Sequence, residues 1–151
     1  MTPAGPAWCS RYPTSRSLDD LAEPFRSGVV AFLADLAARG CTAHIAATRR
    51  PEQRAWLMRG AWDISRGGLA AAPAPRDDID IEWTVSGACA MVATYGLAYR
   101  PSLTSRHIDG LAIDMAVANW SGSAEELYQL GAKHGVHKLR SDPPHWSSDG
   151  H

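Results

Sequence analysis

Apolar positions recur along the chain with two different periods, which predicts helices and short strands in mixed order. The clearest helical block starts after a helix-start signal at residues 17–20 and ends at Gly40. Pro24 suits a first helical turn, where its missing N–H costs no hydrogen bond. The apolar positions of this block follow helical spacing: Phe25, Val29, Phe32, Leu33 and Leu36. We expect a core helix there that carries no chemistry.

The rest of the chain continues this mixture. Residues 111–117 alternate like a half-buried strand, which places Ile113 and Met115 on one face and Asp114 on the other. The other predicted strands are residues 42–48, 97–100 and 136–139, and the other predicted helices are residues 51–58, 82–95 and 123–133. This order is typical of an α+β domain. We therefore expect a small mixed sheet, largely antiparallel, with helices packed on it.

Length and composition predict the domain organisation. A chain of 151 residues can bury its own core, so we expect one domain over residues 1–151. Prolines predict an extended arm at residues 1–16, with a frayed tail as the alternative. Glycines, prolines and alanines predict an irregular loop at residues 63–80, which either borders a cleft or is disordered.

Charge and cysteine content exclude several classes of protein. The formal net charge of −1 leaves no basic field, so nucleic acid is not an expected partner. No stretch approaches the roughly 20 apolar residues of a membrane span, and the first residues lack the layout of a signal peptide. We expect a monomer that is made in the cytoplasm. The three cysteines lie in no C-x-x-C pair, which argues against a disulfide framework and a cysteine zinc site.

Two blocks of the sequence combine residue types that bind metals. Residues 105–114 contain His107 and Asp114, and residues 141–146 contain His145. Zinc takes imidazole nitrogen and carboxylate oxygen, and a catalytic zinc site uses three protein ligands with a fourth position open to water. We predict that His107, Asp114 and His145 bind one Zn²⁺ ion. Taken singly, each of these residues is more often structural.

The spacing within these blocks carries a family resemblance. Ser-x-His-x-x-Gly-x-Ala-x-Asp followed by Asp-x-x-His-Trp resembles the zinc peptidases of bacterial cell walls. These hydrolases include D-alanyl-D-alanine carboxypeptidases, vancomycin-resistance D,D-peptidases and phage L-alanyl-D-glutamate endolysins. The string at residues 48–53, Thr-Arg-Arg-Pro-Glu-Gln, is similar to the Thr-Tyr-Arg-Ser-Pro-Glu-Gln pattern of the same enzymes. The resemblance implies hydrolysis of peptidoglycan stem peptides, with the zinc site on the sheet face in a cleft.

The resemblance also implies roles for individual residues. Asp142 is the implied base that takes a proton from the attacking water, and Arg50 is the implied arginine that holds the peptide near the zinc. Arg49 is the alternative, because the string is one residue shorter than the family pattern. Without the other motifs, the preferred interpretation would be a pair of solvated arginines with no role in a site. Ser105 is expected to bind substrate or to orient the loop. An aspartate base resembles the endolysin branch, whereas the carboxypeptidases commonly use glutamate.

Three questions stay open at the level of sequence. The bond that is cut is either L-Ala–D-Glu or D-Ala–D-Ala, and an enzyme without a signal peptide would act at the cell wall only if exported or released. The acceptors for the outer ring nitrogens of the histidine ligands are expected to be Asp109 or Asp149. A zinc-containing cell-wall or phage-particle binding module without activity is the alternative from another class. A metal nuclease is disfavoured by the missing basic surface.

Overall fold

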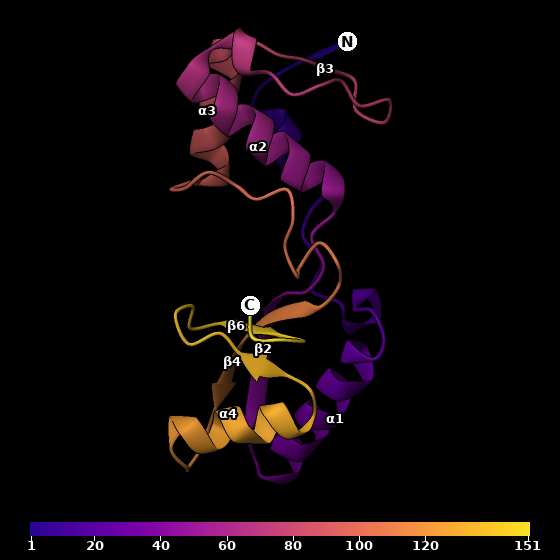
Figure 1. Cartoon of the computed structure of the whole chain (residues 1–151), viewed down its shortest axis with the longest axis vertical. Helices are drawn as coiled ribbons and strands as arrows, with labels where there is room; N and C mark the ends of the chain where they lie inside the picture. The colour runs from indigo at the N-terminus through magenta and orange to yellow at the C-terminus, as the bar shows by residue number, and fades with distance from the viewer. The chain divides into compact units, whose positions relative to one another are not determined.

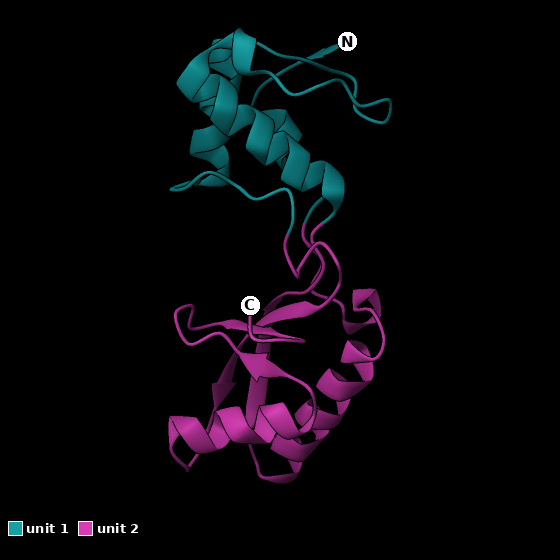
Figure 2. Cartoon of the chain, in the orientation of Figure 1, with its two compact units in different colours: residues 1–13, 51–104 teal, residues 14–50, 105–151 magenta.

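The computed structural model describes all residues from 1 to 151, and they form two compact units (Figures 1 and 2). Unit 1 comprises Met1–Pro13 and Pro51–Thr104, and unit 2 comprises Thr14–Arg50 and Ser105–His151. Each unit is therefore built from segments that are distant in sequence. The single domain expected over residues 1–151 stays a prediction. Chain length alone does not indicate the division into two units.

Unit 2 contains a four-stranded sheet with two helices. The strand order is β2-β4-β6-β5, and every neighbouring pair is antiparallel. The strands are β2 (Thr42–Ala47), β4 (Ala112–Ala118), β5 (His137–Lys138) and β6 (His145–Ser147), and the helices are α1 (Phe25–Ala38) and α4 (Ala124–Lys133). The predicted α+β class with a largely antiparallel sheet is confirmed.

The core of unit 2 lies between the sheet and its helices, which Figure 1 shows on one side of the sheet. The predicted apolar stripe of α1 is buried, and Phe32 is fully inaccessible to solvent. Ile113 and Met115 of β4 face this core, as the alternation predicts. Trp146 of β6 also belongs to the core, with its ring centroid 5.3 Å from that of Phe32. Asp114 lies on the opposite face of β4, which points away from this core.

Unit 1 has its own smaller core. It contains α2 (Glu52–Gly67), α3 (Val85–Tyr95) and a two-stranded parallel sheet of β1 (Thr2–Pro3) and β3 (Ile81–Glu82). The residues buried between these elements are Trp8, Leu57, Ala61, Ile64, Ile79, Ile81, Ala88 and Met91. None of the helices of the chain combines the length and the apolar character needed to cross a membrane.

Several predicted boundaries differ from the structure. The helix expected to end at Met58 continues to Gly67, because Ala61 and Ile64 extend its buried face. The irregular segment therefore begins at Gly68, close to a short 3₁₀ helix, and not at residue 63. The strand expected at residues 97–100 does not form, since no partner strand lies beside it.

The arm expected at residues 1–16 is anchored over its first part. Its residues Thr2–Pro3 pair with β3, and Pro6–Ser10 form a 3₁₀ helix. Trp8 is only 1% exposed, and its indole N–H donates to the carbonyl of Pro3 at 3.0 Å. Burying an indole of this size explains why the arm belongs to the core of unit 1.

Candidate metal centre

Strands β4 and β6 bring two of the predicted ligands together. Asp114 lies directly opposite His145 in the antiparallel ladder, so both side chains project from the same face of the sheet. The neighbours of Asp114 on that face are Ala112 and Ala116, whose small side chains leave room beside the carboxylate. Trp146 follows His145 and points to the opposite face, into the core. Strand alternation thus separates the candidate ligands from the packing residues.

A tight turn delivers the third predicted ligand, His107. The N–H of Leu111 donates to the carbonyl of Arg106 at 2.7 Å and closes the turn. Gly110 has a φ of 75°, a left-handed conformation that favours glycine. Its carbonyl accepts the N–H of Ala22 at 2.9 Å, which fixes the turn against the segment that precedes α1. The glycine of the sequence motif therefore serves the reversal of the chain into β4.

The end of β2 reaches the same place through an irregularity in its pairing. The register shifts between Ile45 and Ala47, so that Ala47 lies opposite Asp114. Such a bulge bends a strand and re-aims the groups that follow it. The next carbonyl, that of Thr48, accepts the Nδ1–H of His107 at 2.6 Å.

The three predicted ligands converge on one point. The distance from His107 Nε2 to Asp114 Oδ1 is 3.1 Å, and the distance from His107 Nε2 to His145 Nδ1 is 3.2 Å. His145 Nδ1 lies 3.2 Å from the same Asp114 oxygen. Both histidines are only 8% exposed. These three residues form a cluster that could hold a metal ion.

Main-chain oxygens accept a hydrogen bond from both imidazoles. His107 donates its Nδ1–H to Thr48, and His145 donates its Nε2–H to the main-chain oxygen of His151 at 2.8 Å. The ring nitrogens that face the cluster therefore present lone pairs. The oxygen of Asp114 is an acceptor as well. Three acceptors meet without a hydrogen of their own, so a metal ion or an added proton must lie among them.

The expectation that Asp109 or Asp149 accepts from the histidine ligands is wrong. Asp149 instead contacts His151, whose main-chain oxygen binds His145. Its carboxylate accepts the N–H of His151 at 3.2 Å and binds Arg106 at 2.7 Å. The hydrogen bond from Arg106 holds the pKa of Asp149 well below its usual range. The sequence offers no signal for the true acceptors, because every residue has a main-chain carbonyl.

The electrostatics of the cluster favour a bound cation. Burial alone would raise the pKa of Asp114, but hydrogen bonds with His107 and His145 outweigh burial and hold this pKa well below its usual range. The hydrogen bond with Asp114 in turn raises the pKa of His145. A half-buried carboxylate that stays ionised thus attracts either a proton or a metal ion to the centre.

The donor set and its spacing fit zinc. Two nitrogens and one oxygen are the ligands of many catalytic zinc sites, and metal–donor distances near 2.0–2.1 Å place tetrahedral donors roughly 3.3–3.4 Å apart. The separations of 3.1–3.2 Å between the three donor atoms come close to that edge. Three protein ligands are also the number that catalytic zinc sites use.

The two arginines of the family-like string have different surroundings. Arg50 is half-buried, and its main-chain N–H donates to the carbonyl of His107 at 3.0 Å. Arg49 is exposed, and its carbonyl accepts the N–H of Ser15 at 2.9 Å. The backbone therefore ties Arg50 to the metal-ligand turn, and the choice of Arg50 over Arg49 stays a prediction.

Ser105 and Asp142 lie on the two segments that carry the histidines. The hydroxyl of Ser105 accepts the N–H of Ile108 at 3.3 Å, which orients the turn of His107. Asp142 is exposed three residues before His145, and its main-chain carbonyl accepts the N–H of that histidine at 3.0 Å. The carboxylate of Asp142 makes no hydrogen bond within the protein, so it is available to a ligand.

Comparison with known proteins gives only distant structural likeness. No family model matches this sequence, and a search of the curated proteins finds no match. Among solved structures, the chain is similar to a zinc complex of a mutant of VanY, a vancomycin-resistance D,D-pentapeptidase from the VanB-type cassette. The TM-score is 0.42 at 14% sequence identity, over 95% of this chain and 82% of that chain. At this distance the function has to be argued from the chain's own geometry.

Proposed function

We propose that this protein is a zinc metallopeptidase that hydrolyses peptide bonds in bacterial peptidoglycan stem peptides. The observation that carries the proposal is the convergence of three metal-ligand atoms, from His107, Asp114 and His145, all 3.1–3.2 Å apart. The other ring nitrogen of each imidazole lies at hydrogen-bond distance from a main-chain oxygen. A histidine with a purely structural role needs only one such hydrogen bond, whereas here the second nitrogen of both rings points at the same carboxylate oxygen.

The chain provides the groups that hydrolysis of a peptide bond needs. When bound, zinc supplies Lewis acidity that acidifies water and polarises a carbonyl. The carboxylate of Asp142 accepts a proton from the attacking water and passes it to the nitrogen of the leaving amine. The guanidinium of Arg50 binds the substrate and offsets the negative charge that develops on its carbonyl oxygen. Ser105 keeps the turn of His107 in place and is a candidate contact of the substrate.

The substrate class follows from the motif resemblance and not from the cluster itself. The two metal-ligand blocks have the order and spacing seen in cell-wall zinc peptidases, and the string at residues 48–53 resembles theirs but is one residue shorter. An aspartate at position 142 favours cleavage of L-Ala–D-Glu over D-Ala–D-Ala, because the endolysin branch uses this shorter acid. We therefore place the endopeptidase reaction first and the carboxypeptidase reaction second.

Mass spectrometry of defined muropeptides tests the proposal. The zinc-loaded protein is incubated with stem peptides that contain both bonds, and the fragment masses identify the bond that is cut. Loss of a single terminal alanine would indicate the carboxypeptidase reaction. Stoichiometric zinc without any cleavage would refute the enzyme and favour a binding module that keeps the metal.

A further inference from the structure

The turn between β5 and β6 carries Asp142 and leads directly into His145. Three main-chain hydrogen bonds build it. Leu139 N–H donates to the carbonyl of His145 at 3.0 Å, and Asp142 N–H donates to the carbonyl of Leu139 at 3.2 Å. His145 N–H donates to the carbonyl of Asp142 at 3.0 Å. The position of the candidate base and that of a candidate ligand are therefore coupled through one short turn.

The side chain of Lys138 donates hydrogen bonds to this turn. Its ammonium group donates to the carbonyl of Leu139 at 2.6 Å and to that of Asp142 at 2.7 Å. The same nitrogen lies 5.7 Å from the ring centroid of Tyr128 and 5.9 Å from that of Trp146. Two charge-assisted hydrogen bonds and two aromatic faces thus surround one cation.

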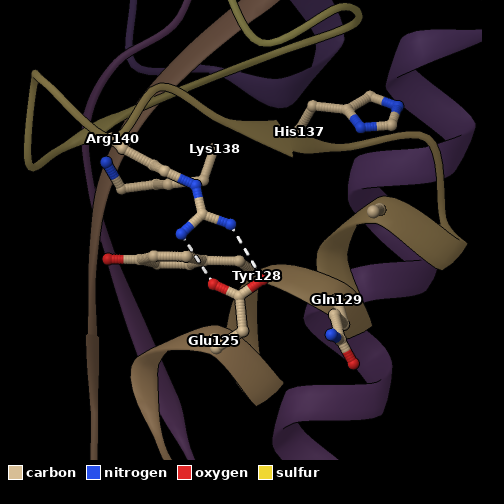
Figure 3. A pocket seen from close by; sticks show the side chains of 7 residues that line it. Glu125, Tyr128, Gln129, His137, Lys138 and Arg140 are labelled. Atoms are coloured by element: carbon tan, nitrogen blue, oxygen red, sulfur yellow. Dashed lines mark hydrogen bonds and ion pairs between the residues drawn. The ribbon is translucent and has the colours of Figure 1, made fainter.

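Lys138 differs from a typical surface lysine in being half-buried and in binding main-chain carbonyls. It forms no ion pair with a carboxylate, whereas the neighbouring Arg140 binds Glu125 at 2.6 Å across the ring of Tyr128 (Figure 3). Burial lowers the pKa of Lys138, while the negative charges of Asp142 and Asp114 oppose this shift. The hydrogen-bond partners of the Lys138 ammonium group are therefore main-chain carbonyls of the turn.

Proline completes the restraint of the turn on its other side. Pro143 and Pro144 separate Asp142 from His145 and have fixed φ angles. The carbonyl of Pro144 accepts the N–H of Met115 at 2.9 Å, which joins the end of the turn to β4. Lys138 is the flexible side chain in this assembly, and its two bonds hold the half of the turn that proline does not.

We propose that Lys138 is a positioning residue, whose ammonium group clamps residues 139–142 so that Asp142, the proposed base, keeps a fixed position relative to His145. This inference rests on the proposed peptidase function and names a further residue on which its rate depends. Lys138 does not touch the reacting atoms. Its removal should lower kcat of the zinc-saturated protein while leaving KM nearly unchanged, because Arg50 remains.

The chain contains only two lysines, which makes a matched comparison simple. Lys138→Met keeps the aliphatic stem between the aromatic rings and removes both hydrogen bonds. Lys133→Met is the control, because Lys133 is exposed at the end of α4. We expect kcat for muropeptide cleavage to fall roughly tenfold or more in Lys138→Met and to stay unchanged in Lys133→Met. Lys138→Arg keeps the charge and the donors and should recover part of the rate.

Amide hydrogen exchange provides a readout that needs no substrate. In Lys138→Met the amides of Asp142 and His145 should exchange about tenfold faster or more, with those of α1 unchanged. An unaltered exchange rate, or a rise in KM at constant kcat, would overturn the clamp. If Lys138→Met does not fold, Lys138→Gln is measured in its place under the same criteria. A wild-type protein that cleaves no muropeptide refutes the proposed function, while exchange still decides the role of Lys138.

Discussion

His107 and His145 present different ring nitrogens to the same point. His107 uses Nε2 and His145 uses Nδ1, and in each case the other nitrogen binds a main-chain oxygen. These acceptors orient the two rings without using a further side chain. Among the side chains of the three ligand residues, the carboxylate of Asp114 is the one that supplies negative charge.

The ligand assignment is tested by removing single residues. His107→Ala and Asp114→Ala should each lower zinc affinity by more than roughly 100-fold, since even outer partners of metal ligands account for 10- to 100-fold. His44→Ala is the control, because His44 is an exposed residue of β2. Metal analysis after dialysis should find about one zinc per chain in the control and almost none in the two variants. Equal zinc in all three proteins would contradict the assignment.

The role of Asp142 is tested by an isosteric change. Asp142→Asn removes the proton acceptor and keeps the shape of the side chain, so we expect zinc content to stay the same. The rate of muropeptide cleavage should fall roughly 10²- to 10⁴-fold, the usual contribution of a general base. Cleavage at the wild-type rate in this variant would remove Asp142 from the mechanism.

The protonation of His145 predicts opposite pH dependences for the metal-free and zinc-bound protein. The pKa of His145 is raised from its ordinary value of 6.5, mainly by the hydrogen bond with Asp114. In the metal-free protein this raised pKa contributes stability that is present below the ordinary value and is lost as pH rises through the folded-state pKa. Zinc competes with the same proton, so zinc affinity should increase over that interval.

Thermal melts and zinc titrations across this pH interval measure both effects. The melting temperature of the metal-free protein should decrease with rising pH relative to His145→Ala, in which the titrating group is absent. Zinc affinity of the wild type should rise over the same interval. A zinc affinity that is constant with pH would show that no proton is displaced on binding.

Among the secondary-structure elements, strand β4 is the one that connects the parts of the candidate metal centre. It pairs with β2 on one edge and with β6 on the other. Strand β6 contributes His145 to the cluster, and Thr48, directly after β2, orients His107. The bulge in β2 aims the carbonyl of Thr48, and the pairing with β6 sets His145 opposite Asp114. Two long-range strand pairings thus convert separate stretches of sequence into one site.

Helix α1 must approach the end of α4 closely for this sheet to be covered. A Cβ atom added at Gly28 would overlap the carbonyl oxygen of His134, a main-chain atom that cannot rotate away. Gly28→Ala should therefore destabilise unit 2 by about 1–3 kcal/mol, although alanine by propensity alone would stabilise a helix by about 1 kcal/mol. Urea unfolding followed by amide exchange of α1 measures the change.

Gly5→Ala is the matched control for this substitution. A Cβ atom at Gly5 would meet nothing within 4 Å, so the free energy of unfolding should change little. A Gly28→Ala protein that is more stable than the wild type would show that α1 and α4 can move apart at this contact.

At the scale of the whole molecule, the candidate metal centre belongs to one unit. The residues proposed to act at this centre all lie within unit 2: the three metal ligands, both main-chain acceptors, Arg50, Ser105 and Asp142. Unit 1 has a separate core around Trp8, Leu57 and Met91. Zinc should therefore stabilise the two units unequally.

Hydrogen exchange with and without zinc tests this division. Zinc at 100 times its Kd stabilises the state that binds it by about 2.7 kcal/mol. Slower exchange is expected for amides of β4 and β6, with little change in α2 and α3. Adding a chelator should reverse the protection in unit 2. Equal protection of all these elements would show that the two units unfold as one cooperative structure.

Parts of the fold were accessible from local sequence alone. The helical stripe from Phe25 to Leu36 and the alternation around Asp114 are short-range patterns, and the structure follows both. The extent of α2 was not accessible, because burial of Ala61 and Ile64 depends on α3 and on the distant Trp8. Residues 97–100 have strand-like composition, but a strand also requires a neighbour to pair with.

The candidate ligands His107, Asp114 and His145 are recognisable in the sequence, because metal-ligand chemistry resides in side chains whose order and spacing can be read directly. The way in which these side chains are held is visible only in the folded chain. The main-chain oxygens of Thr48 and His151 orient the two imidazoles, and a main-chain oxygen becomes specific only through its position in space. The contacts of Lys138 could not be predicted for the same reason, because its partners are main-chain oxygens of a folded turn.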